Sequence, residues 1–186
     1  MFRSVPWIAA AAAVSLLAGP AAQAQEQPRP VPTVAAQGGG TGIPAGAPAA
    51  VKERIAAFLA AAAAGERRTP QRAGRRSWTG CRTVYAWRGY NNPLGMSLFR
   101  YYQQVSWCSN GFSIYSWSRE RWPEISGPGW RFDGHIGSSL GGPSTEKHAW
   151  TQGSFTGCMF GYCQTKVPWI SITVRVDGGY SWNTGD

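Results

Sequence analysis

The chain has 186 residues and a formal net charge of +9, from 18 basic and only nine acidic side chains. A leader and a low-complexity stretch occupy the first 77 residues, so only the part from Trp78 to Asp186 can build a core, which limits the fold to one small domain. Nine of the ten Trp lie in this part, whereas acid–base residues are scarce there, which argues against an enzyme.

The first 24 residues are predicted to be a secretory signal peptide. A basic start at Arg3 precedes an apolar run over residues 8–17, and a small-x-small cleavage signature follows at residues 22–24. An apolar run of about ten residues is too short for a membrane span, which needs roughly 20. We therefore expect a secreted, extracellular protein without a transmembrane span.

Three segments are predicted between the leader and the domain. Residues 25–48 are mostly Pro, Gly, Ala and Gln, a composition typical of a disordered linker. Residues 49–65 are predicted to form a short amphipathic helix, because apolar side chains recur at helical spacing from Val51 to Leu59. The apolar stripe is narrow, so we expect weak attachment to the domain, or removal with a pro-region. Residues 66–77 form a basic linker.

The basic linker carries five arginines, which raises the question of a polyanionic partner. Such a run binds acidic wall polymers or lipid headgroups by releasing counterions. The alternative is a solvated linker with no partner, because charge blocks outside a fold are usually disordered. No nucleic acid is expected as a natural partner of a secreted chain.

Four cysteines in a small secreted domain predict two disulfides, with three possible pairings. A hairpin that turns at Leu94–Gly95 would place Cys81 opposite Cys108, which leaves Cys158 to pair with Cys163 across a tight loop. A zinc site is the alternative, but no Cys-x2-Cys spacing is present. Neither a metal nor a cofactor is predicted.

Short apolar runs separated by Gly- and Pro-rich turns predict an all-β domain over residues 78–186 that folds by itself. Ile170, Ile172 and Val174 alternate with polar residues, as expected for the inner face of a half-buried strand. We predict an antiparallel β-sandwich of the jelly-roll or immunoglobulin-like kind. The expected strands lie within residues 81–87, 96–108, 112–117, 130–136, 149–155, 169–176 and 180–182.

One set of residues resembles a recurrent type of secreted, uncharacterised domain in actinobacteria. The residues that carry this resemblance are Cys81, Leu94–Gly95, the segments 105–111 and 152–158, Gly161–Cys163, Pro168 and the segment 177–180. The resemblance covers residues 79–182 and implies a disulfide-stapled β domain, with no activity and no catalytic residues to carry over.

The candidate binding residues are aromatic. Trp117, Trp122 and Trp130 flank a loop rich in Pro and Gly, and exposed indole rings offer flat apolar faces on which sugar rings stack. These three residues predict a non-enzymatic binding module for a polysaccharide or cell-wall polymer. The alternative for most of the tryptophans is a place in the core.

Besides a binding module, two classes of function stay open, an enzyme and a structural or antagonistic protein, and two sets of residues favour the enzyme. Asp133, His135 and a serine of the Ser138–Ser139 pair imitate a hydrolase triad, because residues two apart on a strand share a face. Glu120 and Glu124 suggest the two carboxylates of a glycosidase, although adjacent arginines also fit a solvated loop. The third class is a structural or antagonistic secreted protein.

Overall fold

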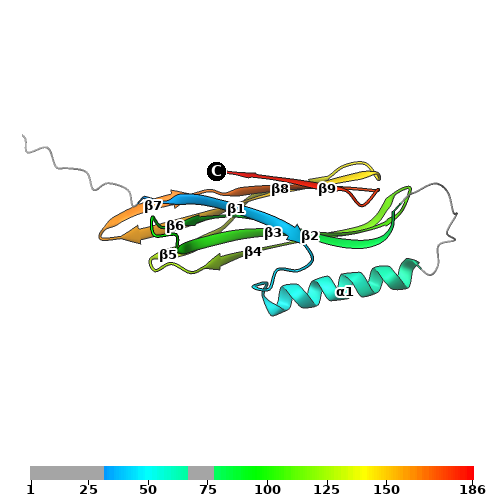
Figure 1. Cartoon of the computed structure of the whole chain (residues 1–186), viewed down its shortest axis with the longest axis horizontal. Helices are drawn as coiled ribbons and strands as arrows, with labels where there is room; N and C mark the ends of the chain where they lie inside the picture. The colour runs from blue at the N-terminus through cyan, green and yellow to red at the C-terminus, as the bar shows by residue number, and fades with distance from the viewer. Residues whose placement is uncertain (1–31, 67–77) are drawn as a thin grey trace, which may run out of the picture.

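The computed structural model describes residues 32–66 and 78–186, which form two antiparallel β-sheets and one helix (Figure 1). The predicted signal peptide and residues 67–77 of the basic linker lie outside the described residues. Sheet A contains β1 (Val34–Thr41), β2 (Thr79–Asn91), β3 (Ser97–Asn110) and β4 (Ile114–Ile125). Sheet B contains β5 (Trp130–Gly141), β6 (Glu146–Met159), β7 (Tyr162–Lys166), β8 (Trp169–Arg175) and β9 (Tyr180–Gly185).

The predicted all-β sandwich is confirmed, and its strand order is simple. Sheet A has the order β1-β2-β3-β4, and sheet B has the order β5-β6-β8-β9, with β7 paired to the far part of β6. Neighbouring strands in each sheet are thus consecutive in the chain, except that β7 and β8 both pair with β6, β7 with residues 155–159 and β8 with residues 146–152. This is a meander in each sheet, whereas jelly rolls and immunoglobulin domains have Greek-key order.

Part of the predicted disordered linker is a strand. Residues Val34–Thr41 pair along their whole length with β2, from Asn91 back to Val84. The Ala and Gly residues of this segment bury little side-chain surface, so the backbone hydrogen bonds to β2 hold it in an extended conformation. A β-carbon added at Gly38 would lie 2.7 Å from the indole nitrogen of Trp87, so the ring packs directly on the backbone of β1. The linker prediction is wrong for this segment, which covers the edge of β2.

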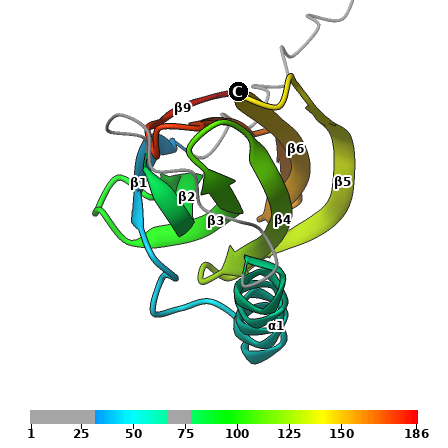
Figure 2. The same ribbon diagram turned by 90° about the vertical axis from the view of Figure 1, so that its right-hand side faces the viewer.

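The predicted helix is confirmed as α1 (Ala49–Glu66), and it is docked. It lies against β3 and β4 on the outer face of sheet A (Figure 2). Val51 and Ile55 are buried against aromatic rings of these strands. Arg54 adds a two-pronged hydrogen bond to Glu120, with distances of 2.9 and 2.8 Å. The expectation of weak attachment overlooked these rings, which fill the space beneath an Ala-rich helix.

The main core lies between the two sheets. Phe99 of β3 stacks on Phe155 of β6 with their ring centroids 4.1 Å apart, so the two sheets meet through aromatic rings. The inner face predicted for β8 is confirmed, since Ile170 and Ile172 are fully buried in this core. Among residues 32–66 and 78–186, no helix has the length and apolarity that a membrane crossing requires.

Both predicted disulfides are confirmed. Cys81 of β2 lies directly opposite Cys108 of β3 and is bonded to it. Cys158 and Cys163 are bonded across the hairpin between β6 and β7. Each bond therefore staples an antiparallel pair that the backbone register already defines.

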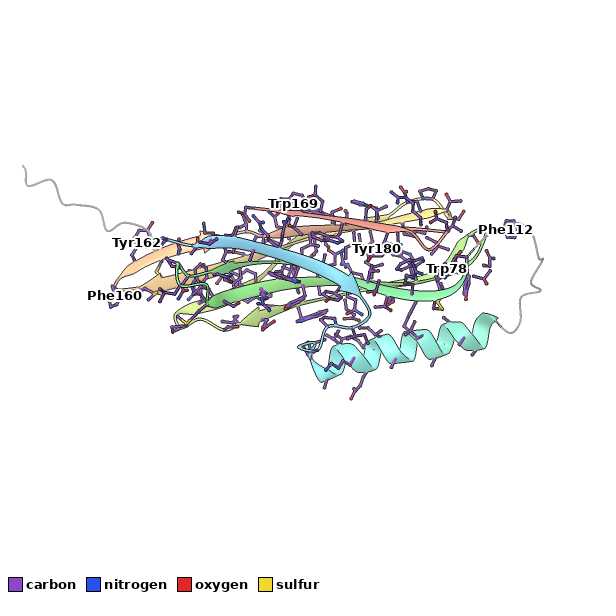
Figure 3. The ribbon with its side chains drawn as sticks, viewed as in Figure 1. Trp78, Phe112, Phe160, Tyr162, Trp169 and Tyr180 are labelled. Carbon is purple, nitrogen blue, oxygen red and sulfur yellow. A yellow bond between two sulfur atoms is a disulfide. The ribbon has the colours of Figure 1, made fainter. Side chains whose placement is uncertain are left out.

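The tip of the β6–β7 hairpin has an unusual backbone. Phe160 and Gly161 both have positive φ angles, 51° and 81°, which are typical of a type I′ turn. This conformation disfavours a residue with a bulky side chain. The Phe160 side chain is 99% exposed at the extreme end of the sandwich (Figure 3).

Candidate functional site

The three tryptophans predicted to form an exposed row are not brought together on the surface. Trp122 is only 5% exposed and Trp130 only 8%, while Trp117 is partly buried against the core between the sheets. All three lie in strands β4 and β5, in which side chains alternate between faces, and the Gly- and Pro-rich loop is only the short connection between these strands. Trp117 therefore points inward and Trp122 points outward, beneath α1. This prediction is corrected.

Trp122 belongs to a ladder of rings under the helix. Its indole is parallel to the Tyr102 ring, at 5.1 Å between centroids and 3° between planes. Trp87 continues the ladder, 6.4 Å from Tyr102. The Trp122 and Tyr102 rings therefore face each other, whereas the Trp87 ring is tilted by 42° relative to Tyr102. Trp122 thus stabilises the docking of the helix, and no flat ring face is left for a ligand.

The triad suggested by Asp133 and His135 is not assembled. A β-bulge between Phe132 and Gly134 interrupts the alternation of β5. His135 consequently lies on the inner side, where its Nδ1 is 2.6 Å from the hydroxyl oxygen of Tyr101. Asp133 lies on the outer side, where it accepts a hydrogen bond of 2.6 Å from the Thr156 hydroxyl. The expectation that both residues share a face is wrong because of the bulge.

The electrostatic surroundings of these two residues also differ. The hydrogen bond from Thr156 lowers the pKa of the Asp133 carboxyl, and Arg131 acts in the same direction. Burial lowers the pKa of His135, and two nearby arginines lower it further. The serines at 138 and 139 are exposed on the far part of β5. Nothing in this arrangement links a carboxylate to an imidazole and a hydroxyl.

The second suggested pair, Glu120 and Glu124, lies on the outer face of sheet A. Glu120 accepts both hydrogen bonds from Arg54, and Glu124 accepts one from the Tyr102 hydroxyl at 2.8 Å. Four residues along a strand correspond to about 13 Å. The paired carboxyl groups of glycosidases lie roughly 5 to 9.5 Å apart. Glu120 therefore contributes to docking α1 and Glu124 binds Tyr102, and the two are too far apart to form a glycosidase pair.

The outer face of sheet B presents a different set of aromatic rings. Trp150 of β6 and Trp169 of β8 are half-buried, and both belong to the side of their strands that points away from the core. The helix covers the opposite side of the molecule (Figure 2), and Figure 3 shows Trp169 on the side away from α1. This face, defined by Trp150, Trp169 and the polar residues between them, is called the sheet B face.

Each of these two rings lies on a glycine of the neighbouring edge strand. A β-carbon at Gly185 would lie 2.7 Å from three atoms of the Trp169 indole, so the backbone meets the flat side of the ring. A β-carbon at Gly137 would likewise lie 2.8 Å from two atoms of the Trp150 ring. Because one side of each ring rests on the backbone, the other side faces outward.

Polar groups fill the space between the two rings. Ser171 lies opposite Trp150 in the β6–β8 register, and Gln152 lies opposite Trp169. Asn183 of β9 lies beside Ser171 and is exposed. Hydroxyl and amide groups beside aromatic faces are the donors and acceptors that a polyhydroxylated ligand requires.

The binding residues predicted from the sequence do not include Trp150 and Trp169, although the sequence carries a signal for Trp169. Trp169 and Ser171 are two positions apart, so they lie on the same face of β8. This face is opposite the inner face that Ile170 and Ile172 predict. The glycines beneath the rings lie 13 and 16 positions away along the chain. Only the strand register reveals that they are neighbours.

No protein-family model matches the chain, and neither curated proteins nor solved structures yield a match. The resemblance to secreted actinobacterial domains therefore stays a prediction. Within the described part of the chain, no three His, Cys, Asp or Glu side chains gather as metal ligands would.

Proposed function

We propose that this protein is a secreted binding module for an extracellular or cell-envelope carbohydrate polymer. The polymer lies across the sheet B face, on the outward sides of the Trp150 and Trp169 rings, and is bound without chemical conversion. Secretion is supported by the leader pattern at residues 1–24 and by the two disulfides, which persist in oxidising compartments.

The observation that carries the proposal is the pair of tryptophans resting on glycines. Trp107 is fully buried in the core, and Trp87 also rests on a glycine but packs with the rings beneath α1. Trp150 and Trp169 instead lie flat on the outer surface, one over β5 and the other over β9. Three strand spacings separate those edges, roughly 14 Å, so the two rings offer separate contacts along one extended chain.

The polar residues between the rings support the same ligand class. Sugar rings combine apolar faces with hydroxyl groups, so they need both stacking surfaces and hydrogen-bond partners. The sheet B face supplies side-chain hydroxyls from Ser171 and Thr173 and amides from Gln152 and Asn183. A protein partner would instead favour a continuous apolar patch.

Retention on insoluble cell-wall polysaccharide tests the proposal. Trp150→Ala and Trp169→Ala should each weaken retention about fivefold, since one stacking contact contributes about 1 kcal/mol. The double variant should lose most retention. Gly185→Ala keeps both rings but displaces the Trp169 indole, so it should resemble Trp169→Ala.

The matched control is Phe112→Ala, which removes an exposed aromatic ring from the β3–β4 turn, away from the sheet B face. Its retention should equal that of the unsubstituted protein. Thermal melting of every variant verifies folding. A folded double variant with unchanged retention would contradict the proposal.

A further inference from the structure

Two arginines lie at the open edge of the sandwich. Arg119 and Arg121 project from the inner side of β4, the edge strand of sheet A, toward β6 of sheet B. Arg119 Nη1 donates to the carbonyl oxygen of Trp150 at 3.1 Å, and Arg121 Nη1 donates to Thr151 Oγ1 at 3.2 Å. Both side chains are half-buried, and each guanidinium has further N–H donors beyond the Nη1 that is bonded.

Polar groups from other strands meet the arginines at this edge. The Tyr101 hydroxyl lies 2.8 Å from Thr151 Oγ1 and 2.6 Å from His135 Nδ1. His135 comes from β5, the edge strand of sheet B, and is exposed. Strands β3, β4, β5 and β6 therefore each contribute a polar side chain to one cluster, which is called the edge cluster.

The edge cluster has no carboxylate. The ion pairs among the described residues use other basic side chains, those of Arg54, Arg88, Arg131 and Arg175. Glu120 lies between the two arginines in sequence but points to the opposite face, where it binds Arg54. Burial lowers the pKa of Arg119, and the positive charge of Arg121 lowers it further, while Tyr101 and the charge of Glu120 on the opposite face oppose this shift only in part.

Such a concentration of positive charge is unfavourable without a partner. Half-buried cations that lose water and gain only neutral hydrogen bonds destabilise the fold. A bound anion offsets this cost. Guanidinium groups bind carboxylates and phosphates with two parallel hydrogen bonds, so paired arginines select oxyanions.

We propose that the edge cluster binds an oxyanion, a carboxylate or a phosphate, carried by the polymer that occupies the sheet B face. That the oxyanion belongs to an acidic polymer rests on the proposed function, whereas the oxyanion site itself is inferred from the contacts of the two arginines. Trp150 connects the two sites, because its backbone oxygen accepts from Arg119 while its ring lies over Gly137 on the outer face of β5.

The first arm of the test uses inorganic phosphate and acetate as probes. Either anion should raise the melting temperature of the full chain, because a ligand that binds the folded state stabilises it. Arg119→Gln and Arg121→Gln should each weaken the affinity for the better anion by roughly tenfold. Arg54→Gln removes an equal charge from the other side of the molecule and should not change the affinity.

A conservative variant guards against loss of folding. Arg121→Lys keeps the charge but loses the planar fork, so it should weaken anion binding several-fold while the protein stays folded. The proposal would be overturned if each anion raised the melting temperature of the three cluster variants as much as it raised that of the unsubstituted protein. A preference for one of the two anions identifies the acidic group.

The second arm compares retention on an acidic polysaccharide with retention on its carboxyl-reduced, neutral form. The unsubstituted protein should prefer the acidic form, and Arg121→Gln should remove this preference without changing retention on the neutral form. Failure of the proposed function would abolish retention on both polymers and leave anion stabilisation intact. Failure of the oxyanion site would leave neutral retention intact and remove the anion effect.

Discussion

The contact between α1 and sheet A makes a strong prediction about Trp122. The indole is 5% exposed, stacks on Tyr102 and lies beneath Val51 and Ile55. Trp122→Ala removes this burial and leaves a cavity, which costs about 3 to 5 kcal/mol for a large aromatic residue. Stacking contributes about 0.5 to 1.5 kcal/mol of the same interaction.

Removal of the Trp122 indole nitrogen recovers part of this lost free energy. The indole Nε1 is buried without a hydrogen-bond partner, which costs about 1 to 3 kcal/mol. We therefore expect Trp122→Ala to lower the free energy of unfolding by about 3 kcal/mol. Trp122→Phe keeps a stacking ring and removes the unpaired donor, so it should lie within about 1 kcal/mol of the unsubstituted protein.

Equilibrium unfolding in denaturant, with intact disulfides, measures both values. A loss of 3 kcal/mol corresponds to a fall of roughly 6 to 12 °C in melting temperature. Phe112→Ala, at an exposed turn, should change stability by less than about 0.5 kcal/mol. If Trp122→Ala were as mild as Phe112→Ala, the ring could not lie under a docked helix.

Three more predictions follow from the fold. Phe160→Asn should raise the free energy of unfolding by about 1 kcal/mol, because Asn-Gly suits the positive φ angles of this turn; a lower melting temperature would argue against that backbone. A chain that begins at Ser77 should melt at a lower temperature and less cooperatively than the full chain, since it lacks β1 and α1; equal melting would show that both are dispensable. The lowered pKa of His135 means that the unfolded state takes up its proton first as pH falls below about 6.5, so stability should decline there. His135→Gln should flatten that decline in pH-dependent melts, and an unchanged slope would assign it to other groups.

Local sequence patterns determined much of this protein. The alternation of Ile170 and Ile172 with polar residues predicts a half-buried strand without knowledge of its neighbours. The disulfide pairing also follows from local information, because a hairpin turn fixes which residues lie opposite each other. The helix at 49–65 is likewise a matter of spacing within one segment.

Tertiary structure decided which aromatic rings face solvent. Trp122 and Trp169 are indistinguishable by composition, yet one is covered by α1 and the other rests on Gly185 of β9. The bulge after Phe132 separates Asp133 from His135, which an uninterrupted strand would place on one face. The pairing of β1 escaped prediction for the same reason, since a strand of small residues is ordered by its partner's backbone and rings rather than by its own side chains.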